Sequence, residues 1–219
     1  MSAKKKTAKP GKKTIIKQYM DFVLEAGEVP ASVYAFAKAV KIEEADFYEH
    51  FGSLKGLQKA VWNAFFEHSM QLLEKNEDYQ GYGNREKMLS FFYTFFELLA
   101  LNRSYVLFTL DGQTNMLKSL EQLKDLRKSV LNFATELIDD GNTDKQLCIT
   151  RHNPKVFAEG AWLQTMFLLK FWIDDDSAGF EKTDMAIEKS VNTIFDVFDN
   201  TPLESIIDFG KFLFKENFA

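Results

Sequence analysis

Apolar residues recur at helical spacing along almost the whole of the 219-residue chain, and no segment alternates between apolar and polar positions as a strand would. The pattern predicts a first helix that begins near Thr14, its N-cap, and ends at Gly27, where a C-terminal glycine belongs. Pro30 then blocks its continuation. The chain is therefore expected to be an all-α protein of about nine or ten helices.

Further helices are expected to follow, separated by turn-rich segments. Ser53 is expected to cap a helix that runs to about residue 75, and Pro154 to stand at the start of another. Turn residues cluster in segments 76–84, 140–145 and 174–179, which are expected to be loops. The apolar spacing predicts the remaining helices over about residues 85–100, 104–110, 114–139, 156–173, 182–198 and 203–214.

Residues 32–57 contain the pattern of two short helices in quick succession. Apolar residues fall on one face of each: Val33, Phe36, Ala37 and Val40 in the first, and Ile42, Ala45, Tyr48 and Phe51 in the second. The break between the helices is too short for them to lie antiparallel, so they must cross steeply. Such a pair is a helix-turn-helix, and its second helix would enter the major groove of DNA.

The same stretch resembles the N-terminal signature of the tetracycline-repressor (TetR) family of transcriptional regulators. The run A-x-x-V-K-I-x-x-A-x-F-Y-x-H-F-x-S-x-x-x-L carries the resemblance, with Phe47-Tyr48, His50-Phe51, Ser53 and Leu57 at the family's positions. It covers about the first quarter of the chain. The expected organisation is a flexible basic arm over residues 1–13, a helix-turn-helix DNA-binding domain over residues 14–57, and a helical ligand-binding and dimerisation domain over residues 58–219.

Composition limits the classes of protein to which the chain can belong. Apolar residues make up 46% of the sequence and include 22 Phe, which is ample material for a packed core. The single cysteine, Cys148, permits no internal disulfide and suits a reducing cytoplasm, and the sequence shows no signal-peptide or membrane-spanning pattern. No Gly-rich phosphate loop, H-E-x-x-H or G-x-S-x-G motif occurs, so the sequence predicts neither an enzyme nor a metal or cofactor site.

Charge is distributed unevenly along the chain. The first seventeen residues contain seven lysines and no acid, whereas the remaining residues carry 20 Lys and Arg against 32 Asp and Glu, a net charge of −12. A basic arm next to a helix-turn-helix is typical of nucleic-acid contact, because lysines neutralise phosphates. The alternative is a solvated terminus that aids solubility.

The second helix of the helix-turn-helix is rich in acids. By resemblance, Tyr48 and His50 would reach phosphates. Glu43, Glu44 and Asp46 occupy base-reading and phosphate-facing positions, where the family usually has Ser, Thr, Gly, Lys or Arg. A carboxylate can accept from cytosine, but several acids near the DNA backbone oppose binding. The expected DNA-binding residues are Lys12, Lys13, Lys41, Glu43, Glu44, Asp46, Tyr48, His50 and Lys55.

The helix expected over residues 156–173 is apolar on almost every side, so it must be covered all round. The resemblance implies a two-fold homodimer in which this helix and the next one pair with their copies as a four-helix bundle. The residues expected at that interface are Ala158, Trp162, Thr165, Leu169, Ile187, Val191, Ile194 and Phe198. The alternative is a deep core within one chain.

The resemblance also implies an apolar cavity in the body, whose occupancy changes the spacing of the two DNA-binding heads. Its expected ligand is a small apolar or aromatic molecule, held by aromatic side chains and a few polar groups. Gln164 is of interest because a buried amide in so apolar a helix needs a partner. The expected ligand-binding residues are Phe91, Phe95, Tyr105, Phe108, Gln113, Asn132, Trp162 and Gln164. The alternative is that these aromatic residues are ordinary core.

Two functions are consistent with these features. The first is a cytoplasmic one-component regulator, expected to be a repressor, that binds double-stranded operator DNA as a homodimer under the control of a small apolar ligand. The second is a protein of the same fold that binds a lipid or another apolar molecule and whose degenerate, acidic helix-turn-helix does not bind DNA. The motif and the lysine arm favour the first, and the acids in residues 43–49 favour the second.

Overall fold

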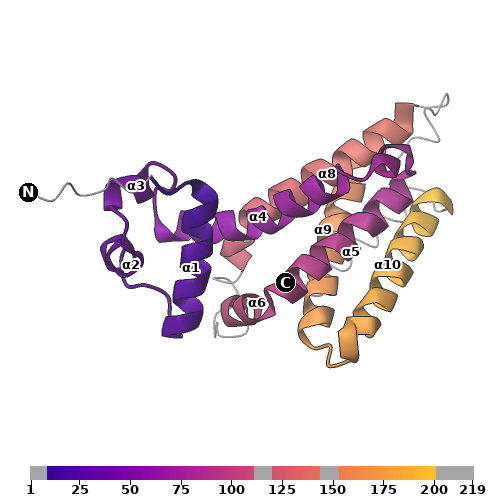
Figure 1. Ribbon diagram of the computed structural model, residues 1–219. Coiled ribbons are helices and arrows are strands. Elements are labelled where there is room, and N and C mark those ends of the chain that lie inside the picture. The colour runs from indigo at the N-terminus through magenta and orange to yellow at the C-terminus, as the bar shows by residue number, and fades with distance from the viewer. Residues whose placement is uncertain (1–8, 111–119, 144–152, 201–219) are drawn as a thin grey trace, which may run out of the picture. The chain divides into compact units, whose positions relative to one another are not determined.

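The computed structural model describes residues 9–110, 120–143 and 153–200, and every regular element in these ranges is a helix (Figure 1). The all-α fold expected from the sequence is confirmed over these ranges. Contacts between Cα atoms divide the chain into two compact units. The first unit comprises Met1–Ala64 and Leu101–Asp125, and the second comprises Phe65–Ala100 and Leu126–Ala219. No helix in the described part of the chain is long and apolar enough to cross a membrane.

Aromatic packing holds the first unit together. Its helices are α1 (Lys12–Ala26), α2 (Val33–Val40), α3 (Glu44–Tyr48), the first half of α4 (Leu54–Leu73) and α6 (Arg103–Leu110). Phe36 on α2 is fully buried, with its ring centroid 5.8 Å from that of Tyr19 on α1 and 6.0 Å from that of Phe47 on α3. Gln58 Nε2 on α4 donates to the Tyr19 hydroxyl at 2.9 Å. These contacts stabilise short helices that are marginal on their own.

The start of α1 differs from the expectation. Thr14 is not the N-cap: Gly11 is, and its carbonyl accepts from the N–H groups of Thr14 at 2.9 Å and Ile15 at 3.1 Å. Lysine is a good helix former, so Lys12 and Lys13 extend the helix beyond the apolar stripe on which the prediction rested. Both lysines therefore belong to the first turn of α1 rather than to the arm.

Several other expected boundaries are confirmed by their caps. Gly27 adopts a left-handed conformation (φ 69°) after the last residue of α1. At the start of α4, the Ser53 hydroxyl accepts from the Gly56 N–H at 3.1 Å. Pro154 is the first residue of α9 (Pro154–Ile173), and Asn153 is its N-cap.

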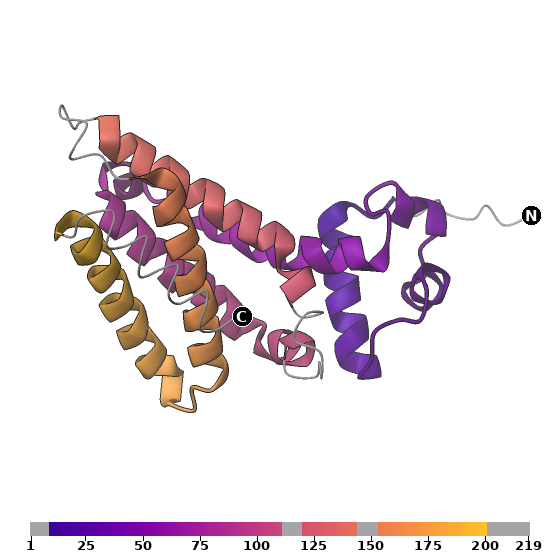
Figure 2. The same ribbon diagram turned by 180° about the vertical axis from the view of Figure 1, so that it is seen from behind.

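The second unit is built around phenylalanines. It contains most of α5 (Asn84–Leu101) and α8 (Lys124–Thr143), all of α9 and α10 (Glu181–Asn200), and two short 3₁₀ helices, η1 (Glu77–Gly81) and η3 (Ala178–Phe180). Phe91 on α5 is fully buried, with its ring centroid 5.5 Å from that of Phe95 and 5.0 Å from that of Phe133 on α8. α9 and α10 run side by side (Figure 2), and Phe157 on α9 packs against Phe195 on α10.

A buried carboxylate organises the connection between α9 and α10. Asp175 accepts four hydrogen bonds, from the N–H and hydroxyl of Ser177 at 2.9 and 2.6 Å and from the N–H and hydroxyl of Thr183 at 2.9 and 2.7 Å. Burial by itself would raise the pKa of this carboxyl, but the four hydrogen bonds outweigh burial and hold the pKa well below its usual range. An ionised Asp175 therefore ties the turn to the first turn of α10.

All three segments expected to be loops contain helical residues. The 3₁₀ helix η1 lies within residues 76–84, and its Tyr79 has a pKa raised to about 12 by burial and by the charge of Glu74. α8 continues to Thr143, past the loop expected from residue 140, and η3 begins within residues 174–179. These helical residues were missed because Gly, Asn and Asp, which mark turns, also occur at the ends of helices. The helix expected over residues 203–214 lies outside the described residues.

Candidate functional site

The link between α2 and α3 is a tight turn in which Lys41 adopts a left-handed backbone conformation (φ 60°, ψ 44°). The Ile42 N–H donates to the Ala37 carbonyl at 3.0 Å and closes the turn. Glycine takes this conformation without strain, whereas for a residue with a side chain the conformation costs roughly 1–2 kcal/mol of conformational energy. Lys41 is exposed, so the strained position displays a positive charge beside Glu43, the N-cap of α3.

The five-residue helix α3 is anchored by one side chain. Phe47 is fully buried, whereas Glu44 and Asp46 are half-buried and Glu43 and Tyr48 are exposed, Tyr48 by 55%. A helix this short is unstable in isolation, so the packing of Phe47 fixes its position. The side chains expected to contact DNA therefore surround one anchored aromatic residue.

The other expected DNA-binding residues are exposed but come from separate elements. Lys12 and Lys13 lie in the first turn of α1, and Lys55 lies in the first turn of α4. His50 is the second residue after α3 and is also exposed. The structure thus places Lys41 beside α3 and brings the remaining lysines to the surface of the same unit.

The base of the lysine arm contacts α3, which the sequence did not predict. Lys9 Nζ forms an ion pair with Glu49 and lies 3.9 Å from Asp46 Oδ1. The ring nitrogen His50 Nε2 lies 3.2 Å from the carbonyl oxygen of Pro10, and since a carbonyl only accepts, the nitrogen is the donor. Lys9 and Glu49 are missing from the expected site because 40 residues separate them in sequence and no periodic pattern links them.

The expected ligand-binding residues are divided between the two units. In the second unit, Phe91 and Phe95 are fully buried with stacked rings, and Trp162 is half-buried. Gln164 is buried, and its Nε2 donates to the Ser190 hydroxyl on α10 at 2.9 Å. All four residues contribute to the packing of the unit, and their ligand-binding role stays a prediction.

In the first unit, Tyr105 on α6 is fully buried with its ring centroid 6.4 Å from that of Tyr19, and Phe108 is half-buried. Burial, with a smaller contribution from Tyr19, raises the pKa of Tyr105 well above its usual range, so the phenol stays neutral. Its hydroxyl has no hydrogen-bond partner among the described residues. Gln113 lies outside the described residues.

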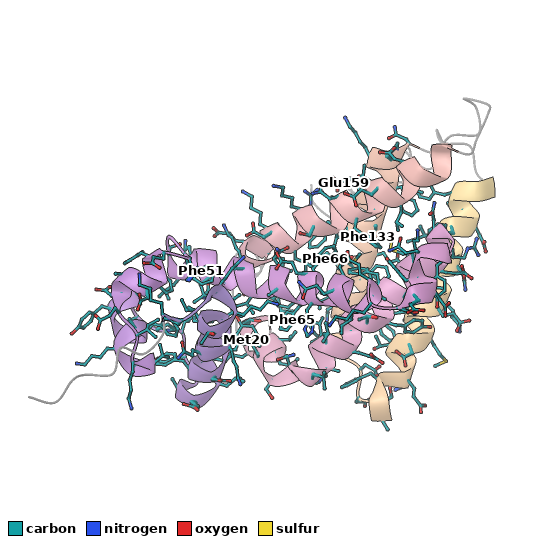
Figure 3. All side chains as sticks on the ribbon, turned by 45° about the horizontal axis from the view of Figure 1, so that its top comes forward. Met20, Phe51, Phe65, Phe66, Phe133 and Glu159 are labelled. Carbon is teal, nitrogen blue, oxygen red and sulfur yellow. The ribbon has the colours of Figure 1, made fainter. Side chains whose placement is uncertain are left out.

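Asn132 is the expected ligand residue that lines a groove. The groove lies between α4 and α8, has a volume of about 400 Å³ and is lined on its apolar side by Phe66 and Phe133 (Figure 3). The two rings have centroids 6.3 Å apart. Three acidic residues also line the groove: Glu67, Glu74 and Glu136.

The expected dimer-interface residues lie mainly on the inner sides of α9 and α10. Trp162 and Ile194 are half-buried, and the other six are buried within the chain: Ala158, Thr165, Leu169, Ile187, Val191 and Phe198. The outer side carries Leu163, Phe167 and Met185, which are 53%, 53% and 51% exposed. Phe167, Met185 and Ile194 line a groove of about 570 Å³. A helix that is apolar all round does not reveal in its sequence which side packs within the chain.

Comparison with known proteins decides the family. A family model described as tetracyclin repressor-like, C-terminal domain, matches residues 87–213, which is more than half of the chain. The chain belongs to the TetR family of transcriptional regulators. The match lies outside residues 37–57, whose motif resembles the TetR signature, so two separate parts of the chain lead to the same TetR assignment. The resemblance seen in the sequence is confirmed.

Solved structures share the TetR fold of this chain. A TetR-family protein from Syntrophomonas wolfei str. Goettingen matches with a TM-score of 0.62 and 14% identity, over 87% of this chain and 95% of its own. The fatty acid degradation regulator FadR from Bacillus halodurans matches with a TM-score of 0.55 and 14% identity, over 90% of this chain and 98% of its own. No curated protein sequence matches the chain significantly. At this identity the two structures show the fold alone.

Proposed function

We propose that this TetR-family protein binds operator DNA as a homodimer, with α3 of each head in a major groove, and represses transcription until a small ligand occupies the body. The observation that carries the proposal is the α2–α3 turn, where Lys41 is held in a strained conformation that glycine would relieve. Backbone strain that persists at an exposed position points to a function there. An exposed lysine can neutralise a DNA phosphate. Operator binding would place the protein in the cytoplasm.

The dimer is proposed to form through the outer side of α9 and α10. Phe167 and Met185 are half exposed on neighbouring helices, and large exposed apolar side chains in one patch are typical of an interface. Phe167→Glu should turn a dimer into a monomer in sedimentation velocity. Leu101→Glu is the control, because Leu101 is an exposed leucine outside these two helices. Equal behaviour of the two variants would contradict this interface.

The ligand is proposed to bind in the groove between α4 and α8. Phe66 and Phe133 offer apolar surface and Asn132 offers a polar group, which is the usual composition of a small-molecule site. The three glutamates repel an anion, so the expected ligand is apolar without net negative charge. Ligand binding would favour a dimer whose heads no longer match successive major grooves.

The experiment that tests DNA binding is fluorescence anisotropy with DNA from upstream of the gene, compared with unrelated DNA of equal length, across a salt series. Selective binding with a steep salt slope is expected. A chain beginning at Gly11 should show a shallower slope, because it loses the arm but keeps the N-cap of α1. Equal, weak binding to both DNAs at low salt would contradict the proposal.

A second candidate function is supported by the acids of α3. Glu43 and Glu49, the caps of the helix that would face phosphates, are exposed, and Glu44 and Asp46 on the helix itself are half-buried. A TetR-fold protein that binds an apolar molecule without binding DNA would tolerate these acids. It would retain ligand in the α4–α8 groove and show no selectivity in the anisotropy experiment.

A further inference from the structure

Three contacts fix the base of the lysine arm on one face of the second helix of the helix-turn-helix. Asp46, Glu49 and His50 are spaced i, i+3 and i+4, so they share a face of α3 and its last turn. Lys9 pairs with Glu49 and lies 3.9 Å from Asp46 Oδ1, while the carbonyl of the next residue, Pro10, accepts from His50. Contacts at two consecutive residues set both the position and the direction of the chain that enters α1.

We propose that Asp46, Glu49 and His50 form an intramolecular docking site that orients the basic arm toward the DNA bound by α3. This inference rests on the proposed DNA-binding function. In this arrangement Asp46 and Glu49 act as positioning residues for Lys9 rather than as base-reading groups. They explain why a DNA-binding helix can carry carboxylates without losing its affinity for phosphate.

The electrostatic consequence of the pair is local neutralisation. Hydrogen bonding and charge attraction between Lys9 and Glu49 lower the pKa of Glu49 and raise that of Lys9, so both groups stay ionised around neutral pH. A paired carboxylate repels a nearby phosphate much less than an unpaired one does. Lys9 is thus held beside α3, and three further lysines, Lys4, Lys5 and Lys6, precede it in the sequence.

The hydrogen bond of His50 supports the same role. With Nε2 donating to the Pro10 carbonyl, only the Nδ1 side of the His50 ring is left to face a phosphate. His50 in this arrangement therefore holds Pro10, while the exposed Tyr48 hydroxyl can donate to a phosphate.

Glu43 provides a matched control within the same helix-turn-helix. It is an exposed glutamate at the N-cap of α3, and no ion pair among the described residues involves it. Neutralising Glu43 should strengthen DNA binding about twofold, since it removes one repelling charge. Simple electrostatics predicts that neutralising Glu49 also strengthens DNA binding, whereas docking of the arm predicts that it weakens DNA binding.

The first experiment compares Glu49→Gln and Glu43→Gln by anisotropy with the operator across a salt series. Glu49→Gln is expected to weaken binding roughly two- to fivefold, the range of an exposed ion pair, and to lower the salt slope by about 1 for each arm lysine that leaves the DNA. The double variant Lys9→Glu with Glu49→Lys should restore wild-type affinity more closely than Lys9→Glu alone. Stronger binding by Glu49→Gln, equal to that of Glu43→Gln, would overturn the proposal.

A second experiment needs no DNA. Carboxyl NMR titration of the full chain should show the Glu49 pKa rising in Lys9→Ala and unchanged in Lys55→Ala, since Lys55 is an exposed lysine on α4 without an ion pair to Glu49 in the structure. If Lys9→Ala leaves the Glu49 titration unchanged, docking is overturned. If the coupling is present but the wild type binds no DNA at low salt, the proposed function and the orientation toward DNA fail, and docking alone stands.

Discussion

Two acidic stretches that look alike in the sequence have opposite roles. In residues 174–176, Asp175 is buried and accepts four hydrogen bonds from Ser177 and Thr183. At the two ends of α3, Glu43 and Glu49 are exposed, and the cation that pairs with Glu49 is Lys9 of the arm. The number of acids in a stretch therefore does not determine what a carboxylate does. A carboxylate near N–H and hydroxyl donors stabilises the fold, whereas one without such donors stays exposed and available to a cation.

The largest expected effect is at Asp175. Asp175→Ala removes a buried acceptor and leaves the N–H and hydroxyl donors of Ser177 and Thr183 without it, so the free energy of unfolding should fall by roughly 2–4 kcal/mol. Urea denaturation measures the loss. The neighbouring Asp176→Asn is the control, and an equal loss in both variants would remove the distinction between the buried and exposed acids.

The buried Asp175 should also make the stability of the protein depend on pH. The folded-state pKa of Asp175 is depressed, so its stabilisation is present above the unfolded pKa of about 3.9 and is lost as the pH falls through the folded value. The wild type should therefore lose stability below about pH 4, and Asp175→Asn should lose less over the same range. Denaturation at a series of pH values tests this, and parallel curves for the two proteins would contradict it.

In the helix-turn-helix, Lys41→Gly should change stability and DNA affinity in opposite directions. Glycine relieves the left-handed strain, so the free energy of unfolding should rise by about 0.5–1 kcal/mol, the larger flexibility of glycine in the unfolded chain offsetting part of the gain. DNA affinity should fall, because the phosphate contact proposed for Lys41 would be lost. A variant that gains stability and keeps full affinity would show that Lys41 does not contact DNA.

The smallest effects are expected at the exposed acids. Glu43→Gln and Asp176→Asn should each change the free energy of unfolding by less than about 0.5 kcal/mol, although Asp176 Oδ1 lies 3.1 Å from Lys182 Nζ. The same urea experiment measures both. A loss near that of Asp175→Ala at either position would mean that exposed acids of this chain also serve the fold.

Local features of the fold were predictable, and features set by distant contacts were not. The glycine after α1, the Ser53 cap and Pro154 at the start of α9 act within one turn of the chain, so the sequence alone indicates them. The pairing of Lys9 with Glu49 and of Gln164 with Ser190 depends on which helices meet, and helical periodicity carries no such information. For the same reason the outer side of α9 could not be distinguished from its inner side.

The anchoring of α3 by Phe47 has a consequence for evolution and for engineering. Because the folding of this helix depends on one inward ring, selection can reverse the charge of its outward positions without unfolding the head. A few substitutions can then convert an acidic version of the helix into a basic one. The acidic version pairs with a lysine of the same chain, and the basic version would pair with phosphate. A library that varies Glu43, Glu44 and Tyr48 around an unchanged Phe47 should therefore give folded proteins, whose DNA binding can then be compared.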